Sequence, residues 1–86
     1  MNKAQRKIEK LAETLMDDTD EAIVAQAIRL FPKCRVAGED QNNAAEHIAD
    51  AVLDGFHVPD DMDKDDLKEE LEDLARERLR KTPKGK

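Results

Sequence analysis

Apolar residues recur at intervals of three and four along most of this chain, which is the spacing that places them on one side of an α-helix. Four segments carry the pattern, with approximate bounds 2–16, 19–31, 40–53 and 61–81. Helices of this kind pack into bundles in which successive helices run in alternating directions. The pattern therefore predicts an all-α fold: a small up-and-down bundle of four helices, three long ones plus a charged C-terminal helix.

The second segment has the widest apolar side, and we expect it to be the central and most buried helix. Thr19 is predicted to cap its start, because a hydroxyl ahead of an acidic first turn accepts hydrogen bonds from the free amides of a helix. Pro32 ends it. Gly55 follows the third segment and matches a left-handed C-terminal cap, with Phe56 folding back on the helix. The apolar positions of the second segment are Ile23, Val24, Ala27, Ile28, Leu30 and Phe31.

The composition supports a single helical domain. The chain has 86 residues, of which 42% are charged, 38% are hydrophobic and only two are aromatic. A chain of this length forms one small domain with a modest core, and so few aromatic residues favour a helical bundle over a β-sandwich. We expect residues 1–81 to form the domain and residues 82–86 to be a disordered basic tail.

The length of the apolar runs and the character of the N-terminal residues bear on where the protein is located. None approaches about 18 residues, and the N-terminal residues are polar and basic, so neither a membrane span nor a signal peptide is expected. Cys34 is the single cysteine and cannot form an internal disulfide. These features predict a cytoplasmic protein with a reduced thiol and no membrane partner.

No segment carries a motif for catalysis or for a cofactor. Asp61, Asp63, Asp65 and Glu72 fall at ligand positions of a calcium-binding EF-hand loop, but Asp66 stands where its sharp turn needs glycine. The acidic start of a helix explains the same residues. No glycine-rich phosphate loop and no nucleophile with a base are present. We expect no catalytic, cofactor-binding or metal-binding residues, and therefore not an enzyme.

Charge is the most informative feature for function. Basic residues open and close the chain, acidic clusters lie between them, and the formal net charge is -6. A short, acidic, helical chain without a catalytic site suits a protein-interaction module that acts as a regulator, adaptor or inhibitor, including the kind made by phages or mobile elements. The partner-binding candidates at the two ends of the fourth helix are Asp61, Asp63, Asp65, Asp66, Arg76, Arg78 and Arg80.

Arg78 is a special case among these candidates, because it falls within the leucine stripe of the fourth helix. Its charge must either extend past the end of the core to water or meet an acidic partner. The first arrangement is the preferred prediction.

Two further partners are considered. Alternating helix directions would bring both basic ends of the chain together as one pole, which could bind nucleic acid, although the net charge makes this the weaker alternative. The sequence leaves open both a monomer and a homodimer through the first and fourth helices, because a core of this size is marginal alone. The candidate residues for nucleic acid are Lys3, Arg6, Lys7, Arg76, Arg80 and Lys81.

Overall fold

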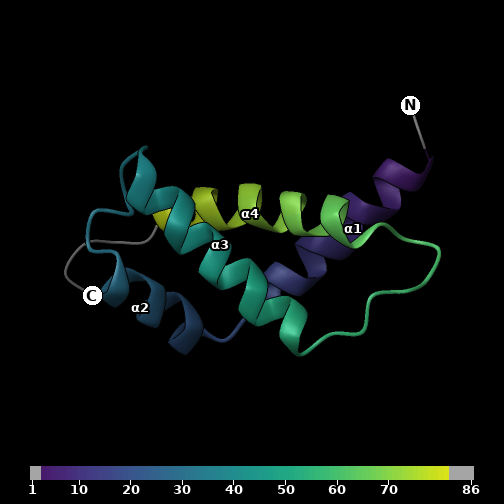
Figure 1. The fold of residues 1–86 in the computed structure, drawn as a ribbon, viewed down its shortest axis with the longest axis horizontal. Helices are drawn as coiled ribbons and strands as arrows, with labels where there is room; N and C mark the ends of the chain where they lie inside the picture. The colour runs from purple at the N-terminus through teal and green to yellow at the C-terminus, as the bar shows by residue number, and fades with distance from the viewer. Residues whose placement is uncertain (1–2, 82–86) are drawn as a thin grey trace.

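The computed structural model describes residues 3–81, which contain four helices and no strand. It confirms the all-α, four-helix bundle expected from the sequence. None of the helices within these residues is both long enough and apolar enough to cross a membrane. The predicted basic tail at 82–86 lies outside the described residues. The helices are α1 (Lys3–Asp17), α2 (Glu21–Leu30), α3 (Glu39–Asp54) and α4 (Lys64–Lys81) (Figure 1).

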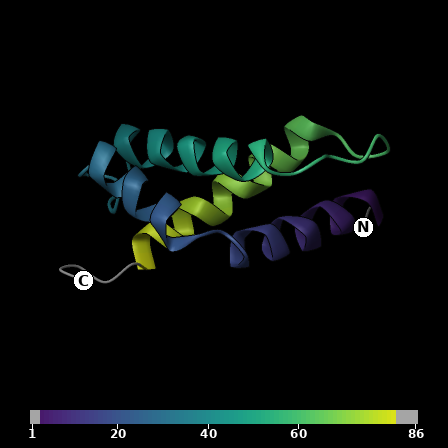
Figure 2. The ribbon, with the colours of Figure 1, turned by 90° about the horizontal axis from the view of Figure 1, so that it is seen from below.

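The central helix is α4, which packs on α3 along one side and on α1 along another (Figures 1 and 2). Leucine or alanine recurs at every fourth position of its inner side, and none of these residues has exposed surface. This spacing keeps the buried positions in one stripe because four residues make slightly more than one helical turn. The stripe is Leu67, Leu71, Ala75 and Leu79.

The prediction that α2 is the central and most buried helix is wrong. It packs chiefly on α3, and its buried residues are Val24 and Ala27. Leu30 is 55% exposed. A wide apolar side shows how much of a helix surface is suited to burial. The positions of the neighbouring helices determine how much of it is actually buried.

Helices α3 and α4 pack on each other, and both bury small side chains. Ala44, Ala45 and Ala49 of α3 and Ala75 of α4 are completely buried. Alanine lets two helix backbones approach more nearly than larger apolar residues do. Ile48, also with no exposed surface, fills the space that the alanines leave.

Helices α1 and α4 run in the same direction. Near their ends, the Arg78 guanidinium donates a hydrogen bond of 2.9 Å to the Met16 carbonyl oxygen. At their starts, Lys3 and Lys7 line the same surface hollow as Asp66. Figures 1 and 2 show that α2 also runs this way along the longest axis, whereas α3 runs back. Directions therefore do not alternate strictly through the bundle, because the short link at 18–20 bends the chain without reversing it.

The helix ends differ from their predicted form at two positions. Asp20, not Thr19, caps α2, since its side-chain Oδ1 accepts a hydrogen bond of 2.9 Å from the Ala22 amide. The Thr19 hydroxyl instead donates to the Leu15 carbonyl oxygen at 2.8 Å, within the last turn of α1. Gly55 has a φ of -96°, so the predicted left-handed cap is wrong. An ordinary backbone suffices there because Phe56 reaches the core without it.

Replacing Leu71 by alanine should lower the free energy of unfolding by about 3 kcal/mol, because it leaves a cavity between the helices that pack on α4. Leu30→Ala is the matched control, since a leucine that is 55% exposed contributes little packing. This control should lower the free energy of unfolding by less than about 1 kcal/mol. Urea unfolding followed by circular dichroism at 222 nm measures both. Similar losses in the two variants would contradict the central position of α4.

Candidate functional site

The acidic residues predicted to bind a partner surround the start of α4. Asp61 and Asp63 lie in the connection before the helix, and Asp65 and Asp66 lie in its first turn, all four exposed to solvent. The Asp63 Oδ1 accepts a hydrogen bond of 2.9 Å from the Asp65 amide. Carboxylates at this place stabilise a helix because its free amides carry partial positive charge. Part of this cluster is thus explained by helix capping.

The three arginines at the other end of α4 differ in their surroundings. Arg76 forms an ion pair with Asp73 and a long hydrogen bond of 3.5 Å to the Asn42 side chain of α3. Arg78 is half-buried and bonds to α1. Arg80 is exposed. Two of the three predicted arginines therefore hold helices together, and Arg80 is the one whose side chain lies on the open surface.

Arg78 lies half-buried and turns toward the end of α1. Its guanidinium meets a backbone carbonyl at the end of α1, where the helix dipole places partial negative charge. The last turn of α1 contains no basic residue of its own. Arg78 of α4 therefore supplies the cation that the end of α1 lacks.

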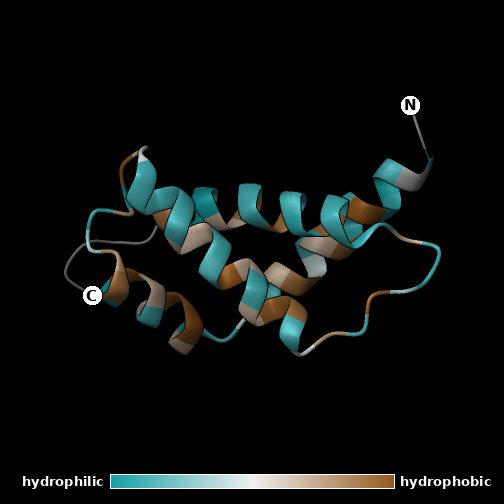
Figure 3. Ribbon diagram, in the orientation of Figure 1, coloured by the Kyte–Doolittle hydropathy of each residue, from teal (hydrophilic) through white to brown (hydrophobic). Residues whose placement is uncertain are grey.

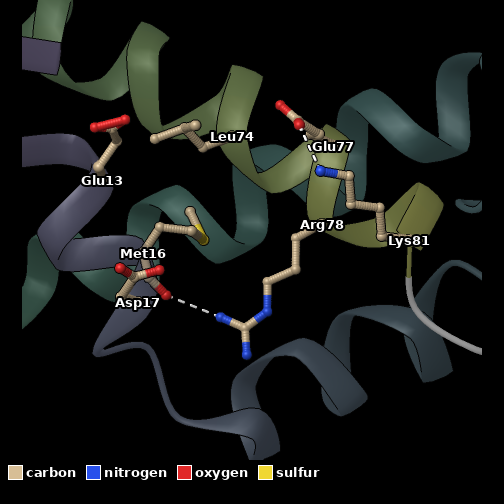
Figure 4. Close-up of a pocket in the computed structure, with 7 residues that line it drawn as sticks. All are labelled: Glu13, Met16, Asp17, Leu74, Glu77, Arg78 and Lys81. Carbon is tan, nitrogen blue, oxygen red and sulfur yellow. Dashed lines mark hydrogen bonds and ion pairs between the residues drawn. The ribbon is translucent and has the colours of Figure 1, made fainter.

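The end of α1 and the end of α4 form an open groove (Figure 4). Arg78 extends across it toward α1, and Lys81 reaches the Glu77 carboxylate on the same helix at 2.8 Å. Met16 and Leu74 are the apolar residues that line the groove, and its other lining residues are charged. Opposite charges facing one another across a groove favour an internal contact between the two helices over an apolar ligand.

The basic residues proposed for nucleic acid are not brought together. Lys3, Arg6 and Lys7 lie at the start of α1, whereas Arg80 and Lys81 lie at the end of α4, and these are opposite ends of the molecule (Figures 1 and 2). The first group faces the acidic start of α4 instead of the second group. The expected single basic pole is therefore absent from residues 3–81, because α1 and α4 run in the same direction.

The outer side of α4 carries a run of carboxylates along its first two thirds. These residues lie opposite the buried leucine stripe, and four of the six are exposed. Figure 3 shows this side of the helix as hydrophilic. Spacing of three and four residues brings each carboxylate beside another on the helix surface. We call this surface the acidic face; it consists of Asp65, Asp66, Glu69, Glu70, Glu72 and Asp73.

One edge of the acidic face meets α1. The Gln5 side-chain amide donates hydrogen bonds to Glu9 on the same helix and to Glu70 on α4, at 3.3 and 3.4 Å. Partial burial raises the pKa of Glu70, and the negative charges of Glu9, Asp73 and Glu69 raise it further. A carboxyl group whose neighbours are mostly carboxyl groups holds its proton more tightly than usual.

The other edge meets α3. Partial burial is the main cause that raises the pKa of Glu72, and Glu46 and Asp50 of α3 add to it, while Lys68 and Arg76 act in the opposite direction. Lys68 is engaged with Asp50 at 3.2 Å. Within residues 3–81, Asp73 is the member of the acidic face that forms an ion pair. The face thus carries more negative charge than nearby cations neutralise.

The described residues contain no group of three or more histidine, cysteine, aspartate or glutamate side chains arranged to hold a metal ion. Cys34 has no exposed surface, and its burial raises the pKa of the thiol. A buried, protonated thiol is a poor nucleophile.

Comparison with known proteins adds no assignment, since no protein-family model, curated protein or solved structure matches the chain.

Sequence reasoning selected the start of α4 but missed the middle of the acidic face. Glu69, Glu70 and Asp73 were not selected, and Glu72 was considered only as a calcium ligand, because acidic residues inside a helix look like an ordinary solvated side. The available signal was the leucine stripe: placing Leu67 and Leu71 inside leaves these four carboxylates together outside.

Arg78→Gln should lower the free energy of unfolding by about 1.5 kcal/mol, because it removes a charge-assisted hydrogen bond between α4 and α1. Arg80→Gln removes the same charge from an exposed position two residues later and should change stability by less than about 0.5 kcal/mol. Thermal or urea unfolding in low salt compares the two. Equal effects would show that the contact with Met16 contributes nothing.

The raised pKa of Glu70 predicts a pH-dependent effect of Glu70→Gln. The folded protein binds this proton more tightly than the unfolded chain, so the group lowers stability as pH rises from the ordinary pKa of 4.5 through the folded value. The variant should therefore be more stable than the wild type at pH 7, and the gain should disappear near pH 4.

Glu77→Gln is the opposite control for this pH effect. The hydrogen bond and charge of Lys81 lower the pKa of Glu77, so this carboxylate stabilises the fold above pH 4.5 and the contribution is lost as pH falls through the folded value. Its replacement should reduce stability at pH 7. Urea unfolding of both variants at pH 7 and near pH 4 measures these changes. A change in the free energy of unfolding at pH 7 with the same sign for both variants would contradict this electrostatic description.

Proposed function

We propose that this protein is a small, non-catalytic protein-interaction module, a regulator, adaptor or inhibitor, that uses the acidic face of α4 to bind a cationic surface of a partner protein. The observation that carries the proposal is the concentration of carboxylates on one exposed side of the central helix. Burial and like charges raise the pKa of Glu70 and Glu72 at its two edges.

The acidic face is costly for the isolated chain. Each pair of like charges three or four residues apart on a helix destabilises it by about 0.2 to 0.5 kcal/mol, and the face contains several such pairs. Helix capping explains Asp63, Asp65 and Asp66, but it does not extend to the second and third turns, where Glu69 and Asp73 lie. Charge retained at a cost to folding supports a role in binding.

A protein partner fits this surface better than a nucleic acid. Phosphates would be repelled by the acidic face, and the two basic groups lie too far apart to contact one short stretch of backbone together. A helix side also presents its charges in a straight row of about 1.5 Å per residue, which suits a lysine- or arginine-rich segment of another chain. Complementary charge of this kind increases association rate and selectivity.

The test is affinity capture with three forms of the full chain. Glu69→Gln, Glu70→Gln and Glu72→Gln together remove three charges from the acidic face while keeping shape and helix propensity. A matched control removes three charges elsewhere, through Glu39→Gln, Asp54→Asn and Asp60→Asn. A partner should bind the wild type and the control, with nuclease present, and bind the face variant about tenfold less, as expected for the loss of three exposed charge contacts.

Two outcomes would contradict the proposal. A partner that binds the face variant as tightly as the control would place the binding surface elsewhere. Material that is captured only in the absence of nuclease would support nucleic acid binding in place of a protein partner. Circular dichroism of all three forms verifies that the helices are intact.

A further inference from the structure

The link between α1 and α2 contains residues that can also form a helix. Residues 18–20 are Asp, Thr and Asp, with neither glycine nor proline among them. α1 ends at Asp17, α2 begins at Glu21, and both run the same way along the molecule (Figure 1). The bend at this link is therefore local and is not enforced by a residue that forbids helix.

The apolar stripe passes through the link without losing its spacing. Ala12 and Met16 are buried on α1, Thr19 is buried in the link, and Ile23 and Ala27 continue at steps of four on α2. A helix running from Lys3 to Leu30 would keep all of these positions on one side. The sequence thus encodes a continuous amphipathic helix as well as the bent pair.

Two local features favour the bend. The Asp20 side chain caps α2 by accepting from the Ala22 amide at 2.9 Å, a bond that a continuous helix does not need. In a continuous helix, Asp17 would lie three and four residues from Asp20 and Glu21, and Asp18 three from Glu21, so like charges would oppose the straight form. The balance between bent and straight forms therefore depends on a cap and on a few carboxylates.

The surface that α1 covers is built to receive this helix. Ile8, Ala12 and Met16 of α1 are buried against the bundle, and α4 is the helix on which α1 chiefly packs. Lys3 and Lys7 lie beside the acidic start of α4, and Arg78 reaches the last turn of α1. An identical α1 from a second copy would satisfy every one of these contacts equally well.

We propose that this chain forms a dimer by exchanging α1. The link straightens, α1 and α2 become one helix, and each α1 packs on α4 of the other copy in the place that its own α1 leaves. This inference concerns the inner side of α4 and stands independently of the function proposed for the acidic face. Short links that straighten are a common origin of exchanged dimers.

A matched pair of variants at one position tests the exchange. Asp20→Ala and Asp20→Pro both remove the α2 cap, but only alanine permits a continuous helix. Proline fits the bent form because Asp20 has a φ of -61°, close to the value that its ring imposes. Sedimentation equilibrium across a concentration series should show a dimer dissociation constant at least about tenfold lower for Asp20→Ala than for the wild type, and only the monomer for Asp20→Pro.

A second pair keeps the cap and changes charge alone. Asp18→Asn with Glu21→Gln removes like-charge pairs from the straight form and should strengthen the dimer, whereas Asp54→Asn with Asp60→Asn removes equal charge far from the link and should not. Circular dichroism verifies folding of each variant. Identical association of Asp20→Ala and Asp20→Pro, or a dimer from the control pair equal to that of the link pair, would overturn the proposal.

Discussion

The packing of α1 on α4 in the same direction is the interaction on which the rest of the structure depends. Taken alone, α1 has its charges in the unfavourable order, with lysines at its positive end and no basic residue in its last turn. α4 has the opposite order, acidic first and basic last. When the two helices lie side by side in one direction, each supplies the charge that suits the other, most directly where Arg78 meets the Met16 carbonyl oxygen.

This arrangement makes α4 the middle helix and fixes which of its sides reaches water. With α1 and α3 covering Leu67, Leu71 and Leu79, the opposite side is left exposed over the first two thirds of α4. The carboxylates of that side have no third helix to neutralise them. An acidic surface that is flanked by two rigid contacts is held in a fixed position, which reduces the ordering cost of binding a partner.

The sequence predicted the helices themselves better than it predicted which helices pack against one another. Periodicity identified four helices and gave the fourth a leucine stripe, which the structure buries. Hydrophobic periodicity does not show which helices pack against one another, so α2 was predicted to be the central helix, a place that α4 occupies in the structure. The order of charges in α1 held the missing information, because an unfavourable dipole arrangement implies a compensating neighbour. Arg78 was likewise visible in the leucine stripe, but a backbone carbonyl as its partner requires the position of α1.

Charge complementarity between α1 and α4 stabilises the bundle without distinguishing one copy of the chain from another. A helix tethered by a three-residue link has an effective concentration on the order of millimolar at its own site, so a second copy competes for that site at high protein concentration, to an extent set by how well the bent link is capped. Asp20 and the carboxylates around it therefore set the balance, although they lie outside the α1–α4 contact. An exchanged dimer would also present two acidic faces at once, and a partner with two cationic segments would bind it more tightly through avidity, with no new contact on either face.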